Sequence, residues 1–150
     1  MYLAQFLRVR EAKEEDLRSV LDIEYKCFPD PYPLSLLHRL HSMHRDTFLV
    51  AENDGRVVGY VIGAIRWHNT AHILAIGVDP AFRGRGVGST LMDEIIKRFQ
   101  CKGAKVVRLE VRKSNLPAQN FYRKLGFVDR FEVPFYYEDG ESAITMERSL

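Results

Sequence analysis

The sequence lacks most of the features that mark secreted, membrane-bound or nucleic-acid-binding proteins. Its 150 residues include only two cysteines, Cys27 and Cys101, too few for a disulfide framework. No apolar run approaches the roughly 20 residues of a membrane span, and early charged residues argue against a signal peptide. Basic and acidic residues nearly balance, with a net charge of +2. We therefore expect a cytoplasmic protein with two buried thiols, whose overall charge recruits neither membrane nor nucleic acid.

What is present favours one globular domain spanning residues 1–150. Apolar residues make up 46% of the chain and charged residues 28%, which is ordinary for a protein with a hydrophobic core. Four arginines are scattered along the chain and form no basic stripe, which argues against nucleic-acid binding. They are Arg8, Arg10, Arg66 and Arg108.

The most informative segment is a glycine-rich stretch between an expected strand and an expected helix. Residues 79–89 read Asp-Pro-Ala-Phe-Arg-Gly-Arg-Gly-Val-Gly-Ser. Glycines let the backbone approach a ligand closely, and the following helix would present free N–H groups and a positive dipole end. Arg83 and Arg85 add charge beside those amides. The segment predicts a site for a phosphate or pyrophosphate, with a tight turn bearing surface arginines as the plain structural alternative.

Spacing separates this loop from two other phosphate-binding loops. It lacks the Gly-Lys-Ser or Gly-Lys-Thr ending of a Walker loop, and its glycines are not spaced as in a dinucleotide fingerprint. The pattern Arg83-x-x-Gly86-x-Gly88 instead resembles the Arg/Gln-x-x-Gly-x-Gly/Ala loop of the GNAT acyltransferase superfamily. In that superfamily the loop holds the pyrophosphate of acetyl-coenzyme A.

Apolar periodicity and turn residues predict a mixed α/β fold. The strand–loop–helix–strand order around the glycine loop requires a parallel pair in an otherwise antiparallel sheet, with helices on both faces. Two Asp-Gly turns predict hairpins, and Ser35 is the expected cap of the second helix. We expect strands at 6–9, 47–52, 56–65, 71–78, 105–111, 127–137 and 142–147, and helices at 13–27, 35–44, 90–100 and 116–125.

Three side chains are candidates for proton transfer. Glu110 should face away from its apolar neighbours and toward the preceding parallel strand, where a carboxylate in a partly dry cleft can act as a general base. Tyr122 could donate a proton. His72 is a rival base, which in a regular strand would point the same way as Ile76 and Val78. A solvated glutamate, an amphipathic tyrosine and a surface histidine are the plain structural alternatives.

Together these residues make the chain resemble a GNAT N-terminal protein acetyltransferase of the RimI-like type or its archaeal and eukaryotic relatives. The stretches at 110–115, 121–127 and 136–143 carry the resemblance, which covers nearly all of the chain. It implies acetyl-CoA as cosubstrate, no metal, and direct attack by a protein or peptide N-terminus in a ternary complex. It also implies the ribosome or a nascent chain as a partner. Cys27 and Cys101 are expected to lie away from the reacting end.

The resemblance assigns a role to each candidate residue. Glu110 would be the base, Tyr122 the acid and His72 the alternative base. Cofactor contacts would come from Ile76, Gly77, Val78, Arg83, Gly84, Arg85, Gly86, Val87, Gly88, Ser89 and Asn115. The acceptor pocket would be walled by Phe28, Pro29, Tyr32, Tyr136 and Tyr137.

Other functions stay open at this point. The same fold serves small-molecule amines and lysine side chains, although an α-amine, with a pKa of about 8, is easier to deprotonate than lysine at about 10.4. A module that binds acetyl-CoA without turnover would need neither Glu110 nor Tyr122. A metal site on His38, His41 and His44 is the remaining alternative, although no further ligand completes it.

Overall fold

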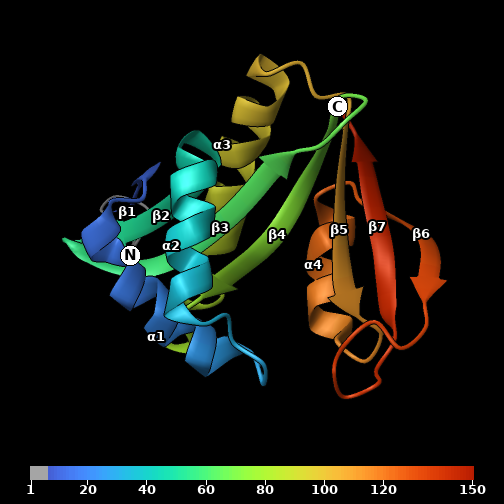
Figure 1. Cartoon of the computed structure of the whole chain (residues 1–150), viewed down its shortest axis with the longest axis horizontal. Coiled ribbons are helices and arrows are strands. Elements are labelled where there is room, and N and C mark those ends of the chain that lie inside the picture. Colours follow the sequence, from blue (N-terminus) through green and yellow to red (C-terminus); the bar gives the residue numbers. More distant parts are fainter. Residues whose placement is uncertain (1–6) are drawn as a thin grey trace.

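A twisted, seven-stranded sheet forms the centre of the computed structural model, which describes residues 7–150. Its strand order is β1-β2-β3-β4-β5-β7-β6, and β4 and β5 form the single parallel pair among the described strands (Figure 1). The predicted mixed, mostly antiparallel sheet is therefore confirmed. The strands are β1 (Leu7–Glu11), β2 (Phe48–Asn53), β3 (Arg56–Ile65), β4 (Thr70–Val78), β5 (Val106–Arg112), β6 (Val128–Val133) and β7 (Ala143–Ser149).

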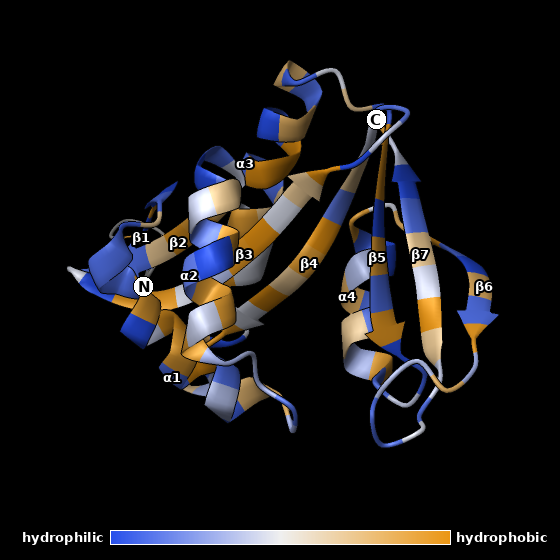
Figure 2. Cartoon of the chain, viewed as in Figure 1, coloured by the Kyte–Doolittle hydropathy of each residue, from blue (hydrophilic) through white to orange (hydrophobic). Residues whose placement is uncertain are grey.

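Helices cover both faces of the sheet and enclose two hydrophobic cores. Side chains alternate along β2, so Phe48 and Val50 belong to one core while Leu49 and Ala51 belong to the other. Strands buried on both faces read as continuous apolar runs, which is why β3 is apolar along its length (Figure 2). The first core is covered by α1 (Leu17–Cys27) and α2 (Leu34–Met43), and the second by α3 (Val87–Cys101) and α4 (Leu116–Lys124).

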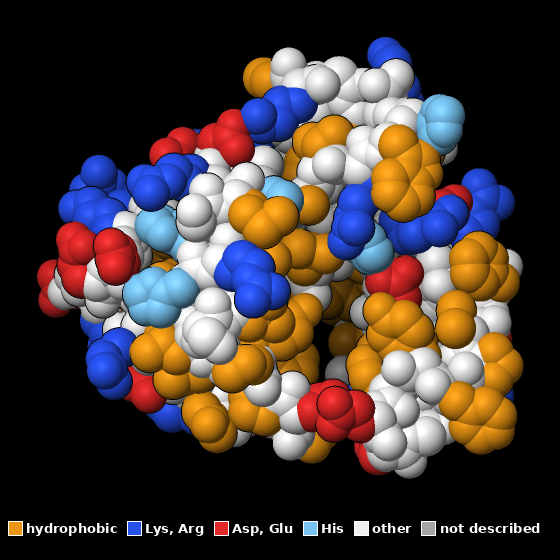
Figure 3. Space-filling model, viewed as in Figure 1, with side chains coloured by type: hydrophobic (Ala, Val, Ile, Leu, Met, Phe, Trp, Pro, Cys, Tyr) orange, Lys and Arg blue, Asp and Glu red, His pale blue; other side chains and the backbone are white. Residues whose placement is uncertain are grey.

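The parallel pair β4/β5 opens soon after it begins. The two strands pair only from Thr70 to His72 on β4 and from Val106 to Arg108 on β5. Beyond these residues they diverge toward their carboxyl ends (Figure 1). Figure 3 shows a hollow between them with apolar side chains on its walls. This gap is where a ligand can reach the middle of the sheet.

A β-bulge in β4 changes which side chains face each core. Ile62 pairs with Ala75 and Gly63 pairs with Ile73, so Leu74 is an extra residue on β4. The side-chain alternation shifts by one residue there. His72 consequently lies on the face opposite to Ile76 and Val78, which pack on the α3/α4 core, and the expectation for a regular strand was wrong.

Several predicted boundaries also move. Helix α3 starts at Val87 rather than at 90, and α2 starts after Pro33 with no side-chain cap, so Ser35 lies inside the helix. Strand β6 ends at Val133 instead of 137, because Phe135 adopts a left-handed φ of 55°. The segment from 134 to 142 is therefore a loop that carries Tyr136 and Tyr137. Phe6, the expected start of the first strand, lies outside the described residues.

The cysteines are less buried than expected. Cys101 is exposed at the end of α3 and Cys27 is half-buried at the end of α1. Cys27 still packs against the edge of the α1/α2 core, whereas Cys101 does not belong to either core.

Candidate active site

The glycine loop has the geometry of an anion site. Asp79 is buried and accepts a hydrogen bond from the Ala81 amide at 3.0 Å, which fixes the turn out of β4. Gly84 and Gly86 have φ values of +76° and +82°, and a Cβ on either would meet open space. Gly86 is the N-cap of α3, and no side chain caps that helix. The first-turn amides of a 15-residue helix thus face the loop with their dipole, as anion binding requires.

The two loop arginines do not point freely into this site. Arg83 donates to the Val78 carbonyl at 3.2 Å and to the Cys27 sulfur at 3.2 Å. Arg85 lies over the Phe82 ring, 5.7 Å from its centroid. Cys27 lies beside this loop, because α1 ends directly against the last residue of β4; its expected distance from the reacting end stays a prediction.

At the head of the gap, His72 and Glu110 face one another. His72 Nε2 lies 2.6 Å from Glu110 Oε1. Their side chains are only 21% and 14% exposed, so the pair is largely shielded from water. Leu109 and Val111 are buried in the α3/α4 core, which turns the intervening Glu110 to the opposite face, as the strand alternation predicted.

Three tyrosines from two loops lie near this pair. Burial raises the pKa of Tyr32 to about 12, and its hydroxyl donates to the carbonyl of the bulge residue Leu74 at 3.1 Å. Burial and the nearby Glu110 carboxylate raise the pKa of Tyr136. Tyr137 packs edge-on against Tyr136 with ring centroids 4.9 Å apart. These phenols remain neutral at physiological pH and can act as hydrogen-bond donors.

Tyr122 lies on the other side of the sheet. It is part of the α3/α4 core, between Phe121 and Phe127, with ring centroids 5.3 and 5.9 Å away. Burial raises the pKa of its phenol well above the usual value. Glu110 and Tyr122 therefore lie on opposite faces of the sheet.

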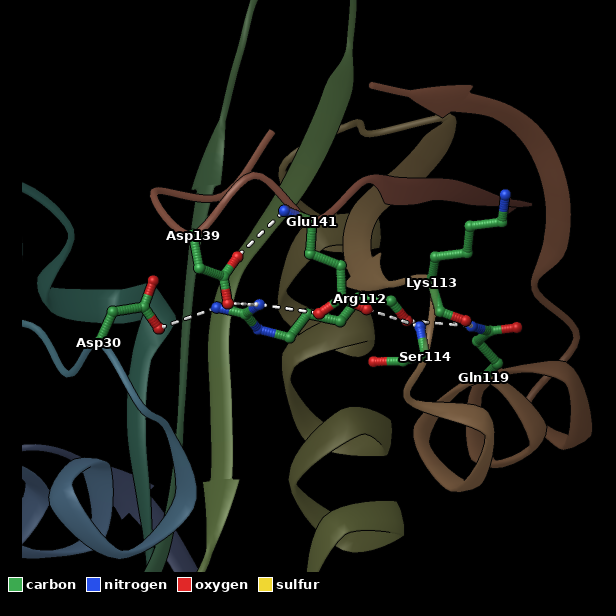
Figure 4. Close-up of polar contacts among 7 residues, drawn as sticks. All are labelled: Asp30, Arg112, Lys113, Ser114, Gln119, Asp139 and Glu141. Carbon is green, nitrogen blue, oxygen red and sulfur yellow. Dashed lines mark hydrogen bonds and ion pairs between the residues drawn. The ribbon is translucent and has the colours of Figure 1, made fainter. Parts of the chain in front are cut away.

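Arg112 was not identified from the sequence, yet it connects the segments around the acceptor side. Its guanidinium donates to Asp139 and Glu141 of the β6–β7 loop, at 2.9 Å each, and to Asp30 of the α1–α2 loop at 3.4 Å (Figure 4). It also stacks over Tyr137, 4.1 Å from the ring centroid. We call this set the Arg112 clamp. The sequence did not reveal this set, because Asp30 and the Asp139/Glu141 pair are more than 100 residues apart and meet only in the folded chain.

Two buried polar residues support the same region and were also missed. Gln119, 4% exposed, donates to the carbonyls of Arg112 and Lys113 and so holds the turn after β5. Glu24, 2% exposed, accepts hydrogen bonds from the Tyr60 hydroxyl and the Tyr32 amide. Burial raises the pKa of Glu24. A charged residue on the apolar face of a helix was the available signal.

The remaining predicted residues are less closely engaged. Asn115 accepts a hydrogen bond from the Ala118 amide at 3.2 Å and caps α4. Phe28 and Pro29 lie in the α1–α2 loop, where Asp30 rather than either of them reaches the Arg112 clamp. Their roles in binding stay predictions.

The histidines of α2 do not converge. His41 is buried against Phe48 and bonds to the Ala12 carbonyl at 2.8 Å, whereas His38 is exposed. Within residues 7–150, no group of three potential ligands could hold a metal ion. Among the same residues, no helix has the length and apolar character needed to cross a bilayer.

The fold and the loop define an acyltransferase of the GNAT type. The sequence profile of the Acetyltransferase (GNAT) family matches residues 17–127, so the chain belongs to this family. Two relatives cover nearly its whole length. An uncharacterized N-acetyltransferase of Methanocaldococcus jannaschii is 42% identical over 139 residues, covering 92% of this chain and 88% of the relative. An N-alpha-acetyltransferase of Sulfurisphaera tokodaii is 34% identical over 155 aligned positions, with 95% and 93% coverage.

Two solved structures share the fold. Ard1 from Thermoplasma volcanium superposes with a TM-score of 0.93 at 36% identity, covering 97% of this chain and 98% of that one. Naa20 of Chaetomium thermophilum, solved in complex with a bisubstrate analogue, has a TM-score of 0.88 at 26% identity, with 95% and 86% coverage.

Proposed function

We propose that residues 1–150 act as one acetyltransferase domain that transfers the acetyl group of acetyl-CoA to the N-terminal α-amine of proteins. The observation that carries the proposal is the opened β4/β5 pair, with an anion-binding loop at one end of the gap and a shielded His72–Glu110 pair at its head. The N-alpha-acetyltransferase relative supports this acceptor. A nascent chain or ribosome as partner and a cytoplasmic location stay predictions.

The loop fits a pyrophosphate. The space in front of Gly84 and Gly86 and the uncapped start of α3 leave room and donors for the diphosphate of coenzyme A. Binding at this end is remote from the reacting carbon, so it orients the thioester in the gap. The backbone of Ile76, Gly77 and Val78 would run alongside the pantetheine arm.

The proton transfers use residues on both faces of the sheet. The acceptor ammonium would lose a proton to the Glu110–His72 pair, directly or through one water. The free amine would bond to the acetyl carbon as the carbon–sulfur bond breaks. Tyr122, whose burial keeps the phenol protonated, would give its proton to the departing sulfur. The attacking nitrogen would release one further proton as the amide forms, and the Tyr122 phenol would regain its proton from solvent. No covalent enzyme intermediate is needed.

The test is acetylation of a peptide library with free N-termini, followed by mass spectrometry residue by residue. Matched peptides with blocked N-termini and a free lysine, and a panel of small amines, test the alternative acceptors. Intersecting initial-velocity plots are expected for a ternary complex. Parallel plots, or turnover only on lysine or small amines, would contradict the proposal, and binding of acetyl-CoA without any turnover would identify a non-catalytic module.

A further inference from the structure

A row of charged side chains crosses the acceptor face of the sheet next to the proposed catalytic pair. Strand pairing sets His72 of β4, Arg108 of β5 and Glu147 of β7 side by side. Paired residues point their side chains to the same face. Arg66 directly follows β3. Its amide donates to the Thr70 carbonyl at 2.7 Å, which extends the pairing with β4 by one residue. By strand alternation, the Arg66 side chain then points to the same face as His72.

The row carries an excess of positive charge. Glu147 accepts hydrogen bonds from Arg108 at 2.7 Å and from Arg130 at 3.0 Å, so one carboxylate is paired with two guanidinium groups. Arg66 is exposed, and in the part of the chain that the structure describes no carboxylate lies within ion-pair distance of it. Figure 3 shows basic side chains along the rim of the hollow on this side.

Arg66 acts on the acceptor site itself. Burial and the Glu110 carboxylate raise the pKa of Tyr136, and the charge of Arg66 opposes that shift. Burial lowers the pKa of His44, and the positive charge of Arg66 lowers it further. The charge of Arg66 therefore acts on His44, just past the end of α2, and on the tyrosine beside Glu110.

The Arg112 clamp decides the direction in which an acceptor chain leaves the site. Arg112 follows Glu110 by two residues on β5 and bridges the α1–α2 loop to the β6–β7 loop (Figure 4). This bridge obstructs a chain at that end of the acceptor side. Arg108 precedes Glu110 by two residues, at the end where β4 and β5 still pair. A peptide with its amine at Glu110 therefore extends toward the charged row.

We propose that Arg66, Arg108 and Arg130 form a subsite for an acidic side chain close to the N-terminus of the acceptor, read chiefly by Arg66. The inference rests on the proposed function. Two residues of β5 span about 6.6 Å, and an extended peptide advances about 3.3 Å per residue, so the third residue of the acceptor lies over the row. Nucleic acid is the disfavoured ligand, because the Glu147 carboxylate interrupts the row of positive charge.

The experiment compares peptides that differ only in Asp, Asn or Lys at one position, scanned through the second to fourth residues. Wild-type kcat/KM should be highest for Asp and lowest for Lys, about tenfold apart at the third residue, as expected for partly exposed charge pairs. The difference should shrink as salt rises. Arg66→Gln should reduce the preference and Arg66→Glu should reverse it. Arg18→Glu, the same charge change at an exposed residue of α1, should retain it.

Three outcomes would overturn the inference while leaving the proposed function intact. One is equal kcat/KM for the Asp, Asn and Lys peptides in the wild-type enzyme. Another is an equal loss on all three peptides in Arg66→Glu, which would indicate a structural role. The last is weakened binding of a short RNA by Arg66→Glu with an unchanged peptide ranking. Absence of turnover on every free N-terminus would overturn the proposed function, and this inference with it.

Discussion

The 2.6 Å contact between His72 and Glu110 joins two residues 38 positions apart in the chain. A histidine and a carboxylate this close can share a proton through their hydrogen bond, so neither can be assigned the whole role of base. The imidazole can hold the proton that the carboxylate receives, or orient the carboxylate toward the amine. The bulge at Leu74 makes the contact possible, because it frees the orientation of His72 from that of Ile76 and Val78, which pack on the α3/α4 core.

Glu110→Gln and His72→Ala should each lower kcat, by about 10²–10⁴-fold if proton transfer limits the rate. Because the residues act as a pair, the double variant should be little worse than the more damaging single variant. The acidic limb of the kcat/KM profile against pH should disappear in the variant, Glu110→Gln or His72→Ala, that removes the group acting as base. Glu138→Gln, in the exposed β6–β7 loop, is the control. Unchanged single-turnover rates in both variants would leave simple positioning of a free amine as the better account.

Tyr122→Phe should lower the single-turnover rate at every pH while coenzyme A affinity is retained. Burial raises the pKa of Tyr122 above its ordinary value near 10, so ionisation of this phenol should cause no loss of wild-type rate between pH 8 and 10. Tyr25→Phe, at a 68% exposed tyrosine of α1, controls for loss of a hydroxyl. A rate in Tyr122→Phe equal to that of the wild type would remove this residue from the proton transfer.

At the scale of elements, two helix ends with the same backbone geometry have different expected roles. Gly86 at the start of α3 and Gly103 just past its end have φ values of +82° and +86°, and a Cβ on either would meet open space. Only the N-terminal end carries free amides and the positive dipole end. A side chain added at either glycine therefore causes the same backbone strain, but only one added at Gly86 would also reach the expected ligand.

Gly86→Glu should weaken coenzyme A binding by well over tenfold, measured by calorimetry, because a carboxylate would occupy the anion site. Gly103→Glu introduces the same side chain under the same backbone strain. It should reduce stability by about 1 kcal/mol and leave coenzyme A affinity near the wild-type value. Equal affinities in the two folded variants would reject the loop as the pyrophosphate site.

The Arg112 clamp is the second element-scale feature, since one side chain holds two loops together. Arg112→Lys keeps the charge but loses the fork and the stacking on Tyr137. It should raise KM for peptide about tenfold and leave KM for acetyl-CoA within about twofold, because the loops border the acceptor. Asp30→Asn should reproduce part of the effect by removing the bridge to the α1–α2 loop alone. Arg123→Lys, at an arginine of α4 paired with Asp129 at 2.9 Å, is the control. A parallel rise in both KM values would indicate a general structural role for Arg112.

At the scale of the whole molecule, the sheet is continuous at one end and open at the other. Elements from the first and last fifths of the chain meet across the opening, so its shape depends on how α1, β3 and β4 are joined. Asp79 makes that junction. It accepts hydrogen bonds from the Ala81 amide and from Lys26 of α1, which lower its pKa, and it also reaches Arg56 of β3.

Asp79→Asn should lower the free energy of unfolding at pH 7 by about 1–2 kcal/mol, because it weakens charge-assisted hydrogen bonds. The pKa of Asp79 is lowered in the folded state, so its stabilisation is present above the unfolded pKa near 3.9. It is lost as pH falls through the folded pKa. The difference in free energy of unfolding between wild type and variant, measured with urea, should therefore shrink as pH falls below about 4. Asp22→Asn, at an exposed position of α1, should show neither effect, and a difference that is as large at pH 3 as at pH 7 would contradict the assignment.

The sequence by itself determined the class of fold and the anion loop, because both depend on short-range rules. Alternation and helical periodicity act over a few residues, and the glycine spacing with a following helix is a local feature. The alternation of Leu109, Glu110 and Val111 was enough to orient the candidate base. These signals also carried the family resemblance that the comparisons confirmed.

Tertiary structure alone decided the parts that join distant segments. The bulge in β4 follows from packing both faces of the sheet at once, and nothing in the local sequence around Leu74 marks it. Asp30 and Arg112 are 82 positions apart, and Arg66 and Arg108 look scattered in the sequence but lie on one face of the sheet. Strand pairing places residues by register rather than by separation along the chain, so the acceptor side of this enzyme became visible only when the sheet was assembled.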